Sequence, residues 1–166
     1  WHSFCLSCPA LDGYYQLGTN NSVAAGRISY TYGFQGPALA LDTACSSSLT
    51  GVHFAVGSMR SGECDMAMCG GVGLMLTPEN LINFSKAGML NAEGRCFTFD
   101  SRANGYVRGE GAGMICVKRL SDALEDGDEP IAVIRGSCVN QDGRSSGLTA
   151  PNGPSQERCI RTALEN

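Results

Sequence analysis

Short apolar segments that alternate with segments of helical spacing constrain the fold of this chain most. Apolar runs of strand length occur at residues 38–41, 66–72, 114–120 and 131–139. Helical spacing is found at about 20–31 with Gly33 placed to end it, at 49–59, at 78–86, at a short segment from Ser121 to Gly127, and from 156 onward. Uninterrupted apolar runs are typical of strands buried on both faces, and helices between strands connect parallel neighbours. The pattern therefore predicts an α/β protein with a largely parallel, covered sheet.

Composition and charge exclude several classes of protein. The 166 residues are 43% hydrophobic, enough to bury a core, and carry a formal net charge of −4. The twelve Lys and Arg residues are scattered, so we expect no nucleic-acid binding. No apolar run approaches the roughly 18 residues of a membrane span, and the first residues lack the pattern of a secretory signal. We expect a cytoplasmic protein without a membrane partner.

The nine cysteines are an odd number in a chain of this kind, which favours reduced thiols that mostly pack in the interior. Cys5 and Cys8 form a CxxC pair, and Cys64 lies close to Cys69 in the sequence. A structural zinc site usually needs four ligands with regular paired spacing. These two pairs are far apart and have no suitable histidine beside them, so we predict no metal site.

One cysteine has flanks that favour chemistry. Residues 42–49 read DTACSSSL, in which Cys45 follows an apolar run and precedes a segment of helical spacing. If a strand ends and a helix begins here, the sulfur faces unpaired backbone N–H groups and the positive end of the helix dipole, which favours the thiolate. Ala44 and Ser46 are small, as a sharp turn that presents a nucleophile requires. The alternative, a cysteine that only packs, stays open because most cysteines are inert.

Long strings of this sequence resemble one enzyme family. They are GPALALDTACSSSLTGVHFAVGSMRSGECDMAMCGGV, FSKAGMLNAEGRCFTFDSRANGYVRGEGAGMICVKRLSDALEDGD and IAVIRGSCVNQDGRSSGLTAPNGPSQ, in this order. They are similar to β-ketoacyl synthases, and specifically to the ketosynthase domains of modular type I polyketide synthases. The resemblance implies a thiolase-like layered α/β fold of two similar halves and a homodimer. Residues 1–127 would be the C-terminal part of the first half, with the nucleophile, and residues 128–166 the start of the second.

The resemblance also implies a reaction. Cys45 would accept an acyl chain as a thioester and pass it to a carbanion, formed by decarboxylation of a malonyl-type extender on an acyl carrier protein. The chain would bind no cofactor directly, because phosphopantetheine is carried by the acyl carrier protein. Thr149, Ala150 and Pro151 match a family loop near the substrate channel. Alternatively, that loop only shapes the backbone, since Pro and Gly are ordinary turn formers.

The family mechanism needs two histidines whose motifs do not occur in this sequence. The histidines present are His2 and His53. Eight residues of helix separate His53 from Cys45 by about 12 Å, too far for a hydrogen bond. We therefore expect an excerpt that is inactive alone and exposes surface that a full domain buries. Two alternatives stay open, namely a fatty acid synthase component and a non-catalytic ketosynthase-like scaffold for dimerisation or carrier-protein docking.

Overall fold

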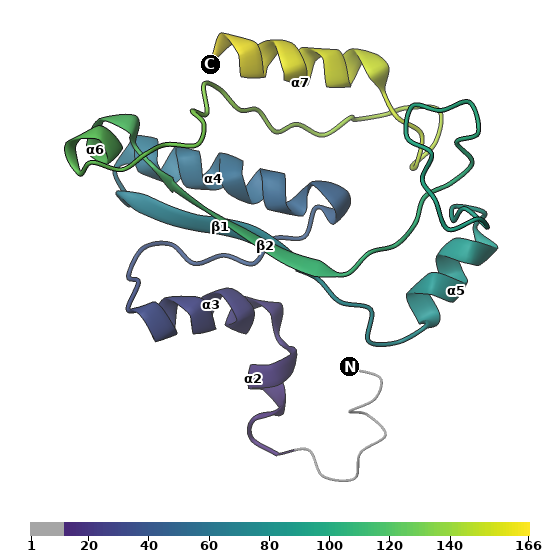
Figure 1. The fold of residues 1–166 in the computed structure, drawn as a ribbon, viewed down its shortest axis with the longest axis horizontal. Coiled ribbons are helices and arrows are strands. Elements are labelled where there is room, and N and C mark those ends of the chain that lie inside the picture. Colours follow the sequence, from purple (N-terminus) through teal and green to yellow (C-terminus); the bar gives the residue numbers. More distant parts are fainter. Residues whose placement is uncertain (1–11) are drawn as a thin grey trace. The chain divides into compact units, whose positions relative to one another are not determined.

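The computed structural model describes residues 12–166 (Figure 1). Its elements, in chain order, are α2 (Tyr15–Thr19), α3 (Asn21–Tyr32), the short 3₁₀ turn η1 (Ala44–Ser46), α4 (Ser47–Ser61), β1 (Met66–Gly73), α5 (Glu79–Lys86), β2 (Gly111–Lys118), α6 (Leu120–Glu125) and α7 (Gly153–Glu165).

The helix predictions are confirmed. Helices α3, α4, α5, α6 and α7 each cover a segment for which the sequence indicates a helix. Gly33 takes a left-handed φ of 72° directly after α3, as a glycine that ends a helix does. Helix α7 begins earlier than the apolar spacing indicates, because the Asn152 side chain accepts a hydrogen bond from the Ser155 N–H at 3.2 Å and caps the helix. The short helix α2 has no counterpart among the predicted elements.

The prediction of a largely parallel, covered sheet is wrong for the described residues. Strands β1 and β2 form a two-stranded sheet. Arg119, which follows β2, donates a hydrogen bond to the carbonyl of Cys64, which precedes β1. Glu110, which precedes β2, accepts a hydrogen bond from the N–H of Met75, which follows β1. The two strands therefore run antiparallel, and most of their residues are exposed.

The other two predicted strands are extended chain without assigned strand structure. Residues 38–41 and 132–140 have no ladder partner in the part of the chain that the structure describes. A strand is stable only with a hydrogen-bonded neighbour, and an apolar run indicates burial without showing which neighbour supplies it. The sequence pattern thus identifies segments suited to a sheet. Which strands they pair with depends on residues outside these segments.

The chain divides into two compact units, and β1 and β2 each contribute residues to both. The unit that contains α2, α3 and α5 also holds a close crossing of two loops. Here Leu90 and Tyr106 form an isolated parallel bridge, and Gly105 has a φ of +101°. A Cβ on Gly105 would lie 2.8 Å from the backbone of residues 89–91, so this crossing requires glycine.

In the unit that contains η1, α4, α6 and α7, the extended segment 131–140 contacts both long helices (Figure 1). His53 Nδ1 on α4 lies 2.9 Å from Ser137 Oγ. On the other side, Cys159 of α7 directs its thiol to the carbonyl of Cys138 at 3.5 Å. Gly136 lies so close to α7 that a Cβ there would meet the carbonyl oxygen of Ala163 at 2.0 Å. These contacts position α7 against the segment.

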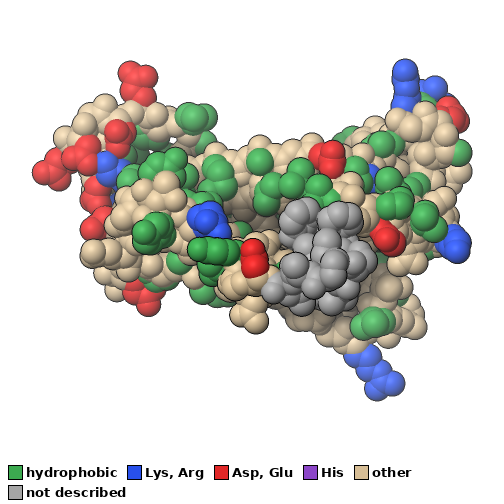
Figure 2. Space-filling model, turned by 90° about the horizontal axis from the view of Figure 1, so that it is seen from below, with side chains coloured by type: hydrophobic (Ala, Val, Ile, Leu, Met, Phe, Trp, Pro, Cys, Tyr) green, Lys and Arg blue, Asp and Glu red, His purple; other side chains and the backbone are tan. Residues whose placement is uncertain are grey.

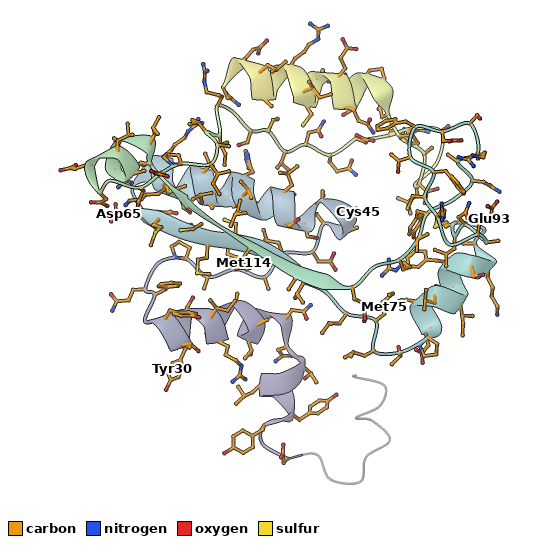
Figure 3. All side chains as sticks on the ribbon, in the orientation of Figure 1. Tyr30, Cys45, Asp65, Met75, Glu93 and Met114 are labelled. Atoms are coloured by element: carbon orange, nitrogen blue, oxygen red, sulfur yellow. The ribbon has the colours of Figure 1, made fainter. Side chains whose placement is uncertain are left out.

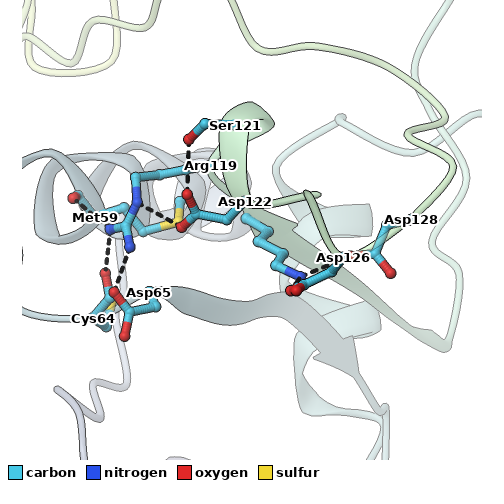
Figure 4. Close-up of polar contacts among 9 residues, drawn as sticks. Met59, Cys64, Asp65, Arg119, Ser121, Asp122, Asp126 and Asp128 are labelled. Carbon is cyan, nitrogen blue, oxygen red and sulfur yellow. Dashed lines mark hydrogen bonds and ion pairs between the residues drawn. The ribbon is translucent and has the colours of Figure 1, made fainter. Parts of the chain in front are cut away.

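The same unit contains a cluster around Arg119, at the end of β2 (Figure 4). Its guanidinium donates to the carbonyls of Met59 and Cys64, each at 3.3 Å, and to Asp122 Oδ2 at 2.8 Å. It also pairs with Asp65. Hydrogen bonding to Asp65 is the main cause that raises the pKa of Arg119 further above its usual value. The cluster joins the C-terminal end of α4, the turn before β1 and the start of α6.

Replacing Arg119 with lysine is expected to lower the denaturation midpoint of a complete domain that contains this sequence. Lysine keeps the charge but lacks the planar fork of donors that reaches two carbonyls and two carboxylates at once. Arg161→Lys is the matched control, because Arg161 is mostly exposed and pairs only with Glu157 of its own helix in the described structure. Chemical denaturation should show a several-fold larger shift for Arg119→Lys. Equal shifts would mean that the cluster adds nothing.

Large apolar side chains are exposed on many elements, and Figure 2 shows hydrophobic groups spread over the face that it presents. Among the described residues, the buried hydrophobic side chains are Met59, Cys69 and Ala123. Large apolar side chains are thus exposed on the described residues, and their burial in a full domain stays a prediction. No helix within residues 12–166 combines the length and the apolar character that crossing a membrane requires.

Candidate functional site

Cys45 lies where the sequence places it, at the entry to a helix. It is the middle residue of η1, and α4 begins two residues later at Ser47. Figure 3 shows Cys45 at this end of α4. Its side chain is exposed and its thiol is free. Cys45 therefore lies in the turn that leads into α4, at the positive end of the helix dipole.

The backbone before Cys45 has an unusual conformation. Ala44 has a φ of 56°, in the left-handed region that residues other than glycine rarely adopt. Such a conformation costs about 1–3 kcal/mol and persists only where surrounding contacts impose it. One contact is a hydrogen bond of 3.0 Å from the Ala44 N–H to Asp42 Oδ1. The Cys45 side chain that follows this turn is exposed.

A cluster of hydroxyl groups surrounds the same turn, and we call it the hydroxyl cluster: Thr43, Ser46, Ser47 and Thr50. Ser46 Oγ donates to the Thr43 carbonyl at 2.9 Å, and Ser47 Oγ donates to the Ala44 carbonyl at 2.7 Å. The Thr43 N–H donates to Ser47 Oγ at 2.9 Å. Thr43 Oγ1 lies 2.8 Å from Ser46 Oγ and 3.2 Å from Thr50 Oγ1. These bonds join the residue before Ala44 to residues after Cys45.

The hydroxyl cluster was not among the predicted site residues. Its signal in the sequence is the density of Ser and Thr around Cys45, since their side chains readily bond to nearby backbone groups at turns and helix starts. The sequence argument uses Ala44 and Ser46 only for their small size. In the structure, Ser46 and Ser47 also supply hydrogen bonds that close the turn.

The environments of the other described cysteines differ from that of Cys45. Cys69 is buried in β1, and burial is the main cause that raises the pKa of its thiol. Burial likewise raises the pKa of the Cys159 thiol. Cys96 and Cys116 are exposed but lie outside the helices. The expectation that most cysteines pack in the interior is wrong for the described residues, because the interior of these two units is small.

No group of three or more His, Cys, Asp or Glu side chains suited to a metal occurs within residues 12–166. Cys64 and Cys69 therefore gain no further ligands in the described structure. Cys5, Cys8 and His2 lie outside the described residues.

His53 is engaged elsewhere. Its ring nitrogen bonds to Ser137 Oγ, and its ring packs edge-on against Phe54 with 5.9 Å between centroids. It thus joins α4 to the extended segment 131–140, as a packed helix residue does. Within residues 12–166, His53 is the only histidine.

Thr149, Ala150 and Pro151 belong to a loop held by a second set of polar contacts. The Asn152 N–H donates to Asp142 Oδ2 at 3.0 Å, and its Nδ2 donates to the Asp142 carbonyl at 2.9 Å. Ser145 Oγ donates to the Ala150 carbonyl at 2.8 Å. The loop leads into α7, which begins on the same side of its unit as α4 (Figure 1). Among the described residues, no hydrogen bond joins Thr149–Pro151 to Cys45.

Ser155, in the first turn of α7, anchors the end of this loop. It is 2% exposed, the least of the buried polar residues described. Asn140 Nδ2 donates to its carbonyl at 2.9 Å and to its hydroxyl oxygen at 3.1 Å. Buried polar groups with satisfied partners hold a loop in one arrangement.

Two family models match the chain. Residues 7–123 match "Beta-ketoacyl synthase, N-terminal domain", and residues 131–166 match "Beta-ketoacyl synthase, C-terminal domain". The spectinabilin polyketide synthase system protein NorA' of Streptomyces orinoci is 57% identical over 152 residues, which are 92% of this chain and 4% of that protein. The polyketide synthase GfsB of Streptomyces halstedii is 51% identical over 156 residues, which are 94% of this chain and 3% of that protein.

Solved structures agree with these relatives. The ketosynthase from module 6 of the bacillaene synthase of Bacillus subtilis has a TM-score of 0.86 and 46% identity, over 94% of this chain and 28% of that one. The oxazolomycin ketosynthase domain OzmH KS7 of Streptomyces albus also has a TM-score of 0.86, with 41% identity over 89% of this chain and 26% of that chain. The chain therefore spans about a quarter of the ketosynthase chains that it matches.

Proposed function

Because the chain belongs to the β-ketoacyl synthase family, with an incomplete thiolase-like α/β fold shared with polyketide synthase ketosynthases, we propose that Cys45 is its acyl-accepting nucleophile. The single observation that supports this role is an exposed, free thiol at the start of α4, next to a left-handed Ala44. Cys96 is also exposed and lies next to a left-handed Phe97, but among the described cysteines that are exposed, Cys45 alone lies at the start of a helix.

The proposed chemistry has two steps at one sulfur. The Cys45 thiolate attacks the carbonyl carbon of an acyl thioester on an acyl carrier protein, and the phosphopantetheine thiol leaves. A malonyl-type extender then loses CO₂, and the resulting carbanion attacks the new thioester carbonyl. A carbon–carbon bond forms, the carbon–sulfur bond breaks and the thiolate returns. Covalent catalysis of this kind divides one difficult step into two easier ones.

We also propose roles for other parts of the chain in this reaction. The positive end of the α4 dipole favours negative charge near the reacting atoms. We place Thr149, Ala150 and Pro151 along the path of the acyl chain, because their loop leads into α7 at the side of the unit where α4 begins (Figure 1). The catalytic histidines would come from chain outside this sequence. In this proposal, residues 1–127 end the first half of the domain and residues 128–166 begin the second, in a cytoplasmic homodimer.

The proposal is tested with a complete ketosynthase domain that contains this sequence. The domain is mixed with a short acyl thioester and with malonyl-loaded acyl carrier protein, and products are read by mass spectrometry. We expect a carrier-bound β-ketoacyl chain two carbons longer and release of CO₂. Omitting the acyl donor is the control and should remove the product. A folded domain that gives neither acyl transfer nor elongation would instead be a scaffold for dimerisation or docking.

A further inference from the structure

We infer that Thr50 is a positioning residue that holds the turn of Cys45 in its reactive geometry, an inference that rests on the proposed function. Thr50 lies on α4, five residues after Cys45. It is one of two polar residues described as buried, with 5% of its surface exposed. Its hydroxyl is directed at Thr43 Oγ1, 3.2 Å away. A buried threonine hydroxyl aimed at the turn before the nucleophile needs a reason beyond packing.

The direction of the hydrogen bonds follows from counting protons. A hydroxyl group has one proton to donate. The Ser46 proton goes to the Thr43 carbonyl, so Ser46 Oγ accepts in its bond with Thr43, and the Thr43 hydroxyl is the donor there. With its own proton used, Thr43 Oγ1 accepts from Thr50. The Thr50 hydroxyl thus donates to Thr43 Oγ1, and the Thr43 hydroxyl donates to Ser46 Oγ.

These hydrogen bonds connect residues on both sides of Cys45. Thr43 precedes Ala44 and Cys45, whereas Ser46 and Thr50 follow them. Thr43 is bonded to both of the later residues, and its N–H is bonded to Ser47 as well. The two residues between are thereby closed into a small loop, which imposes the left-handed φ of Ala44. Thr50 is the buried end of this arrangement and fixes it to the helix.

Loss of the Thr50 hydroxyl is expected to slow chemistry at Cys45 more than it weakens substrate binding. Thr50→Val has nearly the same shape but leaves Thr43 Oγ1 without its donor. A reacting group displaced by a fraction of an ångström to 1 Å loses roughly 10- to 100-fold in rate. Thr50→Ser keeps the hydroxyl and should restore most of the loss. Because Thr50 is buried, we expect it to make no contact with the acyl donor, so the KM of the donor should stay unchanged.

The experiment measures acyl loading of Cys45 in a complete ketosynthase domain that contains this sequence. Rates and KM are determined with a short acyl thioester for wild type, Thr50→Val and Thr50→Ser, with melting temperatures for each. Thr31→Val is the matched control, because the Thr31 hydroxyl bonds within its own helix, to the Arg27 carbonyl at 2.7 Å. A slow Thr50→Val with unchanged KM, rescued by serine, supports the inference. Loading by Thr50→Val at the wild-type rate overturns it.

Thr43→Val alone keeps the inference falsifiable if Thr50→Val folds poorly, and a double-mutant cycle is measured where both variants fold. Thr43→Val removes the other end of the same bond, and residues in one hydrogen-bond network show non-additive effects. We expect Thr43→Val to slow loading as well, and the double variant to be little slower than Thr43→Val alone. Additive losses would overturn the inference. If wild-type protein itself carries no acyl group on Cys45, the proposed function fails instead, whatever the threonine variants do.

Discussion

Cys45→Ala is expected to abolish acyl loading of a complete ketosynthase domain that contains this sequence, by at least about a thousandfold. Alanine has no group that can form a thioester, so the loss concerns bond formation itself. The fold should survive, because the Cys45 side chain is exposed and makes no hydrogen bond that the described structure shows. The measurement is transfer of a radiolabelled acyl group to the protein, with circular dichroism as the check of folding.

Cys116→Ala is the matched control for this variant. Cys116 is a second exposed free thiol, but it lies on β2, away from any helix start. It should load at the wild-type rate. If Cys45→Ala folds and still accepts label at the wild-type rate, Cys45 is not the nucleophile, and the geometry of its turn serves another purpose.

Gly136→Ala is expected to destabilise the domain by about 1–3 kcal/mol, the usual cost of forcing extra atoms into a closely packed site. A Cβ at this position would lie 2.0 Å from the carbonyl oxygen of Ala163 and 3.2 Å from the backbone of Asn166. Both neighbours are backbone atoms, which cannot rotate away as a side chain can. The end of α7 must therefore separate from the segment that also bonds to His53 through Ser137.

Gly147→Ala is the control for Gly136→Ala. Gly147 has nothing within 4 Å of its Cβ position and no left-handed φ, so alanine should be tolerated. Chemical denaturation of both variants gives the free energies of unfolding. A Gly136→Ala protein as stable as Gly147→Ala would show that α7 does not pack against residue 136 in the complete domain.

Helices were predictable from this sequence because their signals are local. The spacing of apolar residues, the glycine after α3 and the segment after Cys45 each lie within one helix or next to it. Pairing of strands is not local, and for that reason the predicted parallel sheet is wrong here. The runs at 66–72 and 114–120 meet antiparallel across more than 40 residues of chain, a partnership that neither run encodes by itself.

In the candidate site too, local features could be predicted from the sequence, whereas contacts between side chains could not. The sequence predicts that Cys45 lies at a helix start, and the structure confirms this position. It does not indicate that Thr43 and Thr50 meet, since hydroxyl contacts depend on rotamers and on the left-handed φ of Ala44. Nor does a sequence pattern indicate the contacts of Asn152 with Asp142, which form only when the loop folds back on itself.

Peptide mapping of the acyl-loaded domain tests the central claim most directly. The complete domain is incubated with an acyl thioester, quenched at low pH to preserve thioesters, digested and analysed by tandem mass spectrometry. The account predicts that the acyl mass is found on Cys45 and that hydroxylamine releases it. An acyl group found on another cysteine, with the peptide that contains Cys45 unmodified, would contradict the account.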